Sequence, residues 1–228
     1  MQARLIRKLE LEMLLSQVKP NPFPKSSLEQ YTIPADVAAT MLHIAAYVNG
    51  NIIDKNVVDL GCGTGRIALG AAFLGAKQVI GVDIDEGAVR LAFESSVNMG
   101  LKEKVGLVVG DIEVIHGNFD TVLQNPPFGV QKRRADRKFL EKALEIGKVI
   151  YSLHKHPEAD KTFVKKLKQS KTGAVQVVPN PFLKNFIERQ GGKIKGVYAM
   201  VMTVPYMFNF HRKKKHEFIV DLFIIEKD

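Results

Sequence analysis

The chain has 228 residues, of which 46% are hydrophobic, and its net charge of +9 at pH 7 favours a polyanionic partner such as nucleic acid. It is long enough to bury a full core, and its single cysteine, Cys62, excludes internal disulfides and cysteine-based zinc sites. The sequence lacks the run of about 18 apolar residues that a membrane helix needs. We therefore expect a cytoplasmic protein without a bound metal.

The first 26 residues are expected to form a helix and a loop ahead of a single domain that spans residues 27–228. Apolar residues recur at near-helical spacing over residues 5–18, and Pro20 closes this helix. A second helix is predicted to run from Pro34 to about residue 48, since proline suits a first helical turn.

Gln30 and Tyr31 lie in the loop immediately before this second helix. Loops at such positions carry ligand contacts in some proteins and simply pack against the core in others. The residue types alone leave both interpretations open.

Residues 56–74 predict a strand, a glycine-rich loop and a helix in succession. The β-branched run 56–60 leads into Gly61-Cys-Gly-Thr-Gly65, and Arg66 starts a buried helix. Alternate glycines let the backbone approach a ligand, and the helix start offers free N–H groups. The Gly-x-Gly-x-Gly spacing differs from the dinucleotide fingerprint, and Asp59 before it would repel a pyrophosphate but suits an amino group.

Each of three later predicted strands has a polar residue at its carboxyl end. Asp83 is the last residue of one strand, and Asp111 and Asn125 follow the other two. An acid such as Asp83 at the tip of the second parallel strand is placed to accept the hydroxyls of a ribose. Because ligands bind at the carboxyl ends of the strands in open α/β sheets, we expect these residues and the glycine loop to share one crevice.

The predicted strands are 78–83, 105–109, 121–124 and 149–153, and the helices are 86–98, 136–148 and 159–169. A last pair, 197–204 and 216–225, is expected to form an antiparallel hairpin at one edge of the sheet.

The turn Asn125-Pro-Pro-Phe-Gly129 follows the fourth strand. Two prolines fix the backbone and leave the carbonyls of Asn125 and Pro126 free to accept hydrogen bonds. This acceptor cluster suits a planar amino group, with Phe128 stacking on the attached ring. The alternative is an ordinary strand-ending turn with a buried phenylalanine. On the first interpretation the catalytic candidates are Asn125, Pro126, Pro127 and Phe128.

The glycine loop with Asp83, Asp111 and the Asn-Pro-Pro-Phe turn resembles the class I S-adenosylmethionine-dependent methyltransferases that modify exocyclic or amide nitrogens. Over nearly the whole chain, the sequence is similar to the methyltransferase-like family that makes N6-methyladenosine in small-subunit ribosomal RNA, in an archaeal-type form. Further motifs that carry this similarity are Leu28-Glu-Gln-Tyr31, Tyr151-Ser-Leu-His-Lys155 and Phe210-His-Arg-Lys-Lys-Lys215.

The resemblance implies a Rossmann-like α/β fold, with a mostly parallel sheet, an antiparallel edge hairpin and helices on both faces. It also implies S-adenosylmethionine as cofactor, RNA as substrate, and a small zinc-binding methyltransferase activator protein as partner. Taken with the loop chemistry, it gives these cofactor-binding candidates: Gln30, Tyr31, Asp59, Gly61, Gly63, Thr64, Gly65, Arg66, Asp83, Asp111, Ile112 and Asn125. The chain departs from the family at Ile33, where threonine is usual, and over residues 170–182, which are longer than expected.

Two basic runs are interpreted as RNA contacts. One directly follows the Asn-Pro-Pro-Phe turn, and the other lies at the hairpin end beside Tyr206, Phe208 and Phe210, a combination that suits phosphate contact with base stacking. The candidates are Lys132, Arg133, Arg134, Arg137, Lys138, His211, Arg212, Lys213, Lys214 and Lys215. A third lysine-rich stretch, 161–171, is equally well explained as a solvated helix face. His154 and His156 are expected to be ordinary surface residues.

The sequence thus predicts an S-adenosylmethionine-dependent N6-adenine methyltransferase that acts on RNA, most simply ribosomal RNA. A protein glutamine N5-methyltransferase acting on a release factor shares the Asn-Pro-Pro-aromatic turn, and a non-catalytic RNA-binding module or a nicotinamide oxidoreductase would keep a similar fold. An activator would pair with an exposed sheet edge, for which strand 105–109 is the candidate.

Overall fold

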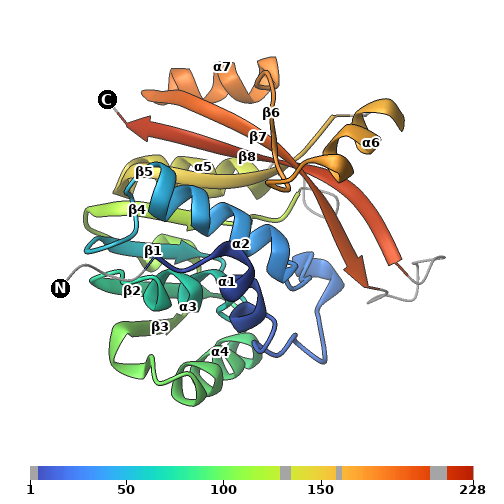
Figure 1. Cartoon of the computed structure of the whole chain (residues 1–228). Coiled ribbons are helices and arrows are strands. Elements are labelled where there is room, and N and C mark those ends of the chain that lie inside the picture. The colour runs from blue at the N-terminus through green and yellow to red at the C-terminus, as the bar shows by residue number, and fades with distance from the viewer. Residues whose placement is uncertain (1–4, 129–134, 158–160, 206–214, 228) are drawn as a thin grey trace.

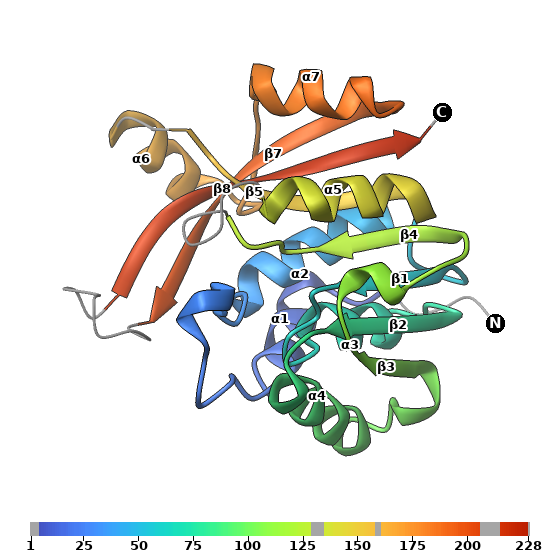
Figure 2. The same cartoon turned by 180° about the vertical axis from the view of Figure 1, so that it is seen from behind.

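The computed structural model describes residues 5–128, 135–157, 161–205 and 215–227. In this part of the chain, one sheet of eight strands carries helices on both faces (Figures 1 and 2). The strands are β1 Asn56–Leu60, β2 Gln78–Asp83, β3 Val105–Val109, β4 Phe119–Gln124, β5 Gly147–Lys155, β6 Val175–Gln176, β7 Gly192–Pro205 and β8 Lys215–Lys227. The helices are α1 Lys8–Leu15, α2 Ala35–His43, α3 Arg66–Phe73, α4 Glu86–Asn98, α5 Ala135–Ile146, α6 Lys161–Gln169 and α7 Pro181–Arg189.

The strand order is β3-β2-β1-β4-β5-β8-β7-β6, with β1 to β5 parallel and the last three strands antiparallel to their neighbours. The chain leaves β1 in one direction towards β2 and β3 and returns on its other side through β4 and β5. This reversal places a crevice at the carboxyl ends of β1 and β4, where open α/β sheets bind ligands. The predicted fold class is confirmed, and β3 is an edge strand as expected.

Two large apolar cores fill the space on either side of the sheet, and a third, smaller cluster joins α6 to β7 and β8. One core joins α1, α2 and α3 to the sheet, and the other joins α5 and α7 to its opposite face. The N-terminal helix α1 is part of the first core, because Leu11 and Leu15 are fully buried within it. The helix spans Lys8–Leu15 and is shorter than the predicted range 5–18, and its Leu9 and Met13 are exposed.

The C-terminal hairpin of β7 and β8 was predicted, but two elements before it were not. β6 adds a short strand outside β7, and α7 covers the sheet face that α5 also covers. The start of α7 has a readable signal: the Asn180 side chain accepts hydrogen bonds from the Phe182 and Leu183 amides, and Pro181 occupies the first turn. Residues 170–182, whose role the sequence left open, therefore hold β6 and the cap of α7.

The helices that the structure describes include none long and apolar enough to cross a membrane.

Candidate functional site

A cavity of about 320 Å³ opens at the carboxyl ends of the parallel strands. Its wall combines the loop before α2, the glycine loop, the tips of β2 and β4, and the start of α5. The residues predicted from the sequence that line it are Gln30, Tyr31, Gly61, Gly63, Thr64, Arg66, Asp83, Asp111, Ile112, Asn125, Pro127 and Lys138. The structure thus gathers twelve candidates from six separate segments at one cavity. Asp59, Gly65, Pro126, Phe128 and Arg137 do not line its wall.

The glycine loop has no room for side chains at two of its positions. Gly65 ends the loop in a left-handed conformation, with φ of 84°, and a Cβ there would lie 2.9 Å from the Cβ of Ala92. At Gly61, a Cβ would lie 2.9 Å from the ring of Phe139, which also lines the cavity. Side chains at either position would close the space or move α4 and α5.

Asp83 anchors this loop to the second strand. Its Oδ2 accepts a hydrogen bond of 2.8 Å from the Gly63 amide, and its Oδ1 accepts one of 2.9 Å from the Asp85 amide. Burial raises the pKa of Asp83, and these backbone hydrogen bonds offset part of the rise. Asp83 also lines the cavity.

The loop before α2 is fixed to the same region through Lys25 and Asp85, which are not among the residues predicted from the sequence. The Gln30 Nε2 donates a 2.8 Å hydrogen bond to Asp85, and Lys25 pairs with the same carboxylate at 3.2 Å. The Gln30 Oε1 accepts a 2.8 Å hydrogen bond from the Lys25 amide. Gln30 therefore holds the loop at the cavity edge, which is a role for its polar atoms besides any contact with a ligand.

Arg66 and Thr64 bring unsatisfied polar atoms to the cavity wall. The Arg66 guanidinium donates hydrogen bonds to the carbonyls of Ile33 and Val18, which ties both N-terminal loops to α3. Its Nε and the Thr64 Oγ1 are buried without a hydrogen-bond partner in the described part of the chain. Buried polar atoms of this kind usually have a partner, so both positions suit the polar groups of a bound ligand.

Asp59 lies behind the wall rather than in it. It is 1% exposed, its Oδ2 accepts a 3.0 Å hydrogen bond from the Ala68 amide, and its Oδ1 has no hydrogen-bond partner among the described residues. Burial raises the pKa of Asp59 to about 8, with a further contribution from the nearby Asp83. Since Asp59 does not line the cavity, any contact with a ligand would have to pass through water.

This raised pKa predicts that the unfolding free energy falls as the pH rises from about 4 to about 8. Over this range the folded protein keeps the proton on Asp59, whereas the unfolded chain has lost it near the ordinary aspartate pKa of about 3.9. The Asp59→Asn variant has no such proton to lose. We expect a smaller decline in its thermal stability over this pH range, measured by thermal unfolding of both proteins.

Asp120→Asn is the matched control, since Lys148 lowers the pKa of Asp120 and its carboxylate contributes stability at neutral pH. The Asp120→Asn variant should therefore be less stable than the wild type at pH 7. An Asp59→Asn protein with the same pH profile as the wild type would contradict the assignment of a neutral Asp59.

The Asn-Pro-Pro-Phe turn enters the cavity from the end of β4. The Asn125 Oδ1 and the Tyr31 hydroxyl are both buried and without a hydrogen-bond partner in the described residues. Burial raises the pKa of Tyr31, and its approach to the Asn125 side chain offsets that rise in part, although the two groups do not reach the geometry of a hydrogen bond. The turn thus presents an unused acceptor beside a phenol.

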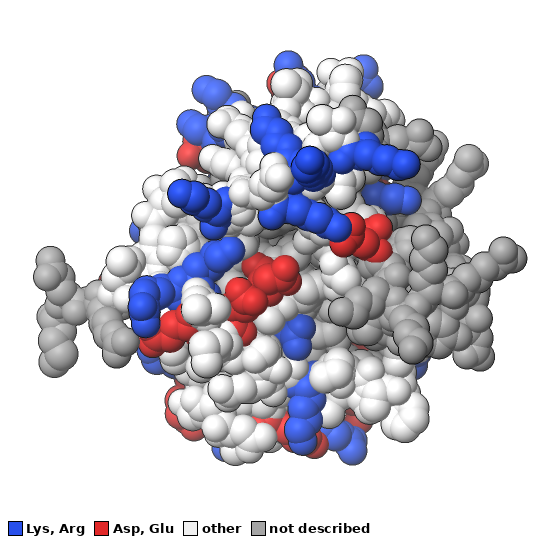
Figure 3. Space-filling model, turned by 45° about the vertical axis from the view of Figure 1, so that its right-hand side comes forward, with Lys and Arg blue, Asp and Glu red and all other residues white. Residues whose placement is uncertain are grey.

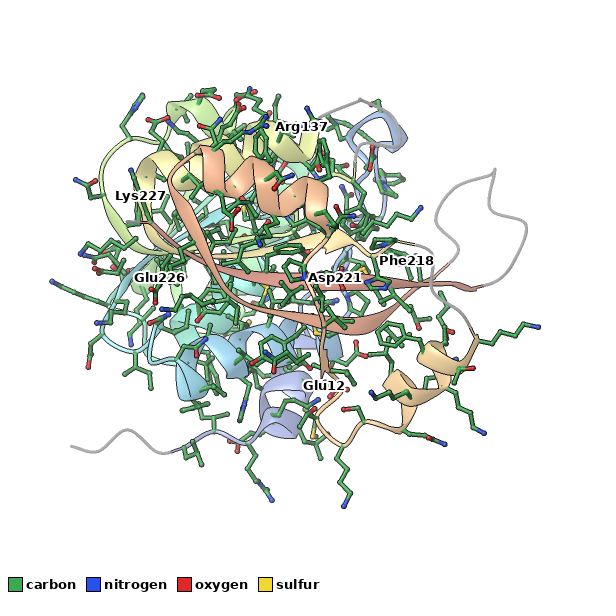
Figure 4. The ribbon with its side chains drawn as sticks, turned by 90° about the horizontal axis from the view of Figure 1, so that it is seen from above. Glu12, Arg137, Phe218, Asp221, Glu226 and Lys227 are labelled. Atoms are coloured by element: carbon green, nitrogen blue, oxygen red, sulfur yellow. The ribbon has the colours of Figure 1, made fainter. Side chains whose placement is uncertain are left out.

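Phe128 belongs to a group of three aromatic rings. Its ring centre lies 5.6 Å from that of Tyr31 in a tilted arrangement and 5.7 Å from that of Phe218 in an edge-on one. Phe218, labelled in Figure 4, belongs to β8, and no motif of the sequence singled it out. The Tyr31 ring therefore lies on the cavity wall with Asn125, while the Phe128 ring packs against Tyr31 outside that wall.

The structure describes few of the predicted RNA contacts. Arg137, labelled in Figure 4, comes from α5, and its guanidinium carbon lies 4.5 and 5.8 Å from the ring centres of Phe182 and Phe186 of α7. Lys138 pairs with Asp111 at 2.8 Å. The side chain of Lys215, at the start of β8, is not described. Lys132, Arg133, Arg134, His211, Arg212, Lys213 and Lys214 lie outside the described residues. Figure 3 shows other Lys and Arg side chains gathered over a hollow that carries acidic side chains.

The expectation that His154 and His156 are surface residues is wrong. His154 is 2% exposed, and burial lowers its pKa to about 3. His156 is largely buried and pairs through Nδ1 with the carboxylate of Asp221 at 2.8 Å, while its ring stacks on Phe163 of α6. Strand β5 is covered on both faces, so its polar residues could not be assigned to solvent by alternation.

Comparison with known proteins identifies the family. A family model for the methyltransferase small domain matches residues 35–172, which is more than half of the chain. The chain belongs to the methyltransferase small domain family. Its methyl donor is S-adenosylmethionine, and the cavity with its unsatisfied Thr64 and Arg66 atoms suits that ligand.

Relatives of this methyltransferase cover almost its full length. MJ0284, an uncharacterized protein of Methanocaldococcus jannaschii, is 38% identical over 98% of this chain and 95% of its own length. The rRNA N(6)-adenosine-methyltransferase METTL5 of Danio rerio is 32% identical over 93% of this chain and 95% of its own. Among solved structures, PH1948 of Pyrococcus horikoshii, provisionally described as an RNA methyltransferase, is 35% identical with a TM-score of 0.81, covering 98% of this chain and 99% of that one.

Proposed function

We propose that this methyltransferase transfers the methyl group of S-adenosylmethionine to N6 of an adenine in RNA, and that the RNA is ribosomal. The observation that carries the proposal is the buried Asn125 Oδ1, an acceptor without a partner among the described residues, at the cavity wall and beside the aromatic rings of Tyr31 and Phe128. Two METTL5 relatives, from Danio rerio and Drosophila melanogaster, carry the name of an rRNA N6-adenosine methyltransferase and support the choice of base and RNA.

The cofactor supplies an electrophilic methyl group when it is bound. The residues that would hold it are Asp83, at the ribose, and Thr64 and Arg66, whose unsatisfied atoms suit the polar end of the amino acid portion. Lys138 and Asp111 pair with each other at the other side of the cavity, next to Ile112.

Asn125 and the carbonyl of Pro126 would each accept one hydrogen from the adenine amino group. The lone pair of that nitrogen is delocalised into the ring, so two acceptors that pull its hydrogens aside favour the pyramidal geometry that attack requires. The amino group would lie beside Asn125, close to the buried hydroxyl of Tyr31. Phe128 would hold the base by stacking. No residue has to remove a proton before attack, since the product nitrogen is cationic and loses its proton readily.

The two basic runs are assigned to RNA phosphates on this proposal. Changing Lys213, Lys214 and Lys215 together to Glu is expected to weaken RNA binding and to reduce its salt dependence, because phosphate contacts release counterions. Binding of S-adenosylmethionine should be unchanged in the same variant, since none of the three lysines is among the residues assigned to the cofactor. Fluorescence anisotropy of a labelled RNA at several salt concentrations measures both effects, and unaltered RNA binding would refute the assignment.

A small zinc-binding activator protein is proposed to pair with the edge strand β3. One edge of β3 has no neighbouring strand in the described sheet, and Val109 is exposed at its end. The test is co-expression with a candidate activator followed by size-exclusion chromatography.

The proposed activity is tested by incubating total RNA and cell protein with labelled S-adenosylmethionine and this enzyme. Label that is removed by ribonuclease and resists protease supports RNA as the acceptor. Label only in protein would favour the glutamine N5-methyltransferase alternative and contradict the proposal. Absence of label with intact cofactor binding would favour a non-catalytic RNA-binding module.

A further inference from the structure

A chain of buried polar side chains lies directly behind the Asn-Pro-Pro-Phe turn. The Gln124 Nε2 donates a 2.8 Å hydrogen bond to the Ser152 Oγ, and the Ser152 Oγ lies 2.7 Å from the His154 Nε2. The His154 Nδ1 in turn faces the Asp136 carboxylate at 3.9 Å. Gln124 and Ser152 are fully buried, so three polar side chains occupy space that apolar residues would fill at lower cost.

This chain spans the ends of the segment that carries the turn. Gln124 is the last residue of β4 and immediately precedes Asn125, while Asp136 lies in the first turn of α5. Ser152 and His154 sit between them on β5, where Ser152 is the register partner of Gln124. Both ends of residues 125–135 are therefore connected through β5 by side chains as well as by the sheet.

The Asp136 carboxylate favours one tautomer of His154. The Ser152 oxygen accepts a hydrogen bond from Gln124 and keeps its own hydroxyl proton, which it can donate to the His154 Nε2. The ring proton of a neutral His154 then resides on Nδ1, which faces Asp136. The low pKa of His154 keeps the ring neutral near pH 7, and its edge packs on Phe223 at 5.4 Å between ring centres.

We propose that His154 is a positioning residue for methyl transfer: through Ser152 it holds Gln124, and thereby Asn125, in register with the start of α5. The inference rests on the proposed function in taking the Asn-Pro-Pro-Phe turn as the catalytic element. Hydrogen bonds in such a chain polarise one another, so cutting it at any point loosens the whole. The consequence is a shift of Asn125 relative to the cavity, with the fold retained.

The kinetic test uses His154→Phe, Ser152→Ala and the double variant. Each single change is expected to lower kcat by about 10- to 100-fold at saturating substrates, since a misplacement of about 1 Å can cost that much. The Kd for S-adenosylmethionine should stay within about twofold, and the double variant should lose no more than the worse single one. The matched control is Tyr151→Phe, which removes buried hydrogen bonds to Asn49 and Asn51 from the same strand and should lower the melting temperature without changing kcat.

Unchanged kcat in a folded His154→Phe protein, or losses in the two single variants that multiply in the double one, would overturn the proposal. A second measurement needs no variant and no substrate: ¹⁵N NMR of histidine-labelled wild-type protein should show His154 as the neutral Nδ1–H tautomer without titration between pH 5 and 8. An Nε2–H tautomer, or titration in that range, would overturn it as well. If the wild type methylates a substrate other than RNA, the proposed function fails, and the kinetic test is run on that substrate.

Discussion

Replacing Asn125 with Ala is expected to lower kcat for methyl transfer by about 30- to 1000-fold, which corresponds to about 2 to 4 kcal/mol of transition-state stabilisation. The Asn125 Oδ1 is a buried acceptor at the cavity wall without a partner in the described residues, so the substrate amino group would be its hydrogen-bond donor. Its loss would leave the amino nitrogen planar and poorly aimed. The measurement is kcat with saturating S-adenosylmethionine and RNA.

Cofactor binding and folding serve as controls for this variant. The Kd for S-adenosylmethionine, measured by isothermal titration, should change by no more than about threefold, because the proposed mechanism uses the Asn125 Oδ1 for the methyl acceptor and other residues hold the cofactor. Asn180→Ala is the matched change, since Asn180 caps α7 away from the cavity; it should cost about 1 kcal/mol of stability and leave kcat unchanged. Full activity of Asn125→Ala would rule out the amino-group clamp.

Replacing Asp83 with Ala is expected to weaken S-adenosylmethionine binding by at least about 100-fold. The Asp83 carboxylate accepts hydrogen bonds from the amides of Gly63 and Asp85, so its removal releases the glycine loop as well as the ribose contact. A hydrogen bond to a charged group contributes about 1.5 to 3 kcal/mol. Loss of the bonds from the two ribose hydroxyls to the Asp83 carboxylate therefore accounts for a change in affinity of that size. Isothermal titration with S-adenosylmethionine measures the effect directly.

Asp120→Ala is the matched control for Asp83. Asp120 also lies on a parallel strand and accepts a hydrogen bond from a backbone amide, that of Asn56, but it is not part of the cavity wall. Its variant should bind S-adenosylmethionine as the wild type does. Equal affinities of Asp83→Ala and the wild type would contradict the assignment of this carboxylate to the cofactor.

The parallel half of the sheet was predictable from the sequence because each strand is a short apolar run that ends in glycine or a polar residue. The site followed from the same rule: Gly61, Asp83 and Asn125 all lie at carboxyl ends, and parallel strands bring those ends to one edge. The C-terminal part was less readable. The β7–β8 hairpin was found by its alternation, whereas β6 is only two residues long and gives no periodic signal.

What the sequence could not provide is the set of contacts between distant segments. Gln30 and Asp85 are 55 residues apart, and Arg66 reaches the carbonyl of Val18 across 48 residues. No local sequence pattern predicts such pairs. Through them, Gln30 and Arg66 connect separate segments of the cavity wall. The burial of His154 was missed for a related reason, since helices and the C-terminal hairpin cover the strand that a local interpretation placed at the surface.

The central claim is tested most directly by identifying the methylated nucleoside. RNA from small and large ribosomal subunits is incubated with the enzyme and labelled S-adenosylmethionine, digested to nucleosides, and separated by liquid chromatography with mass detection, with Asn125→Ala as the inactive control. The account predicts label in N6-methyladenosine, and none with the control. Label in any other nucleoside, or equal labelling by Asn125→Ala, would contradict it.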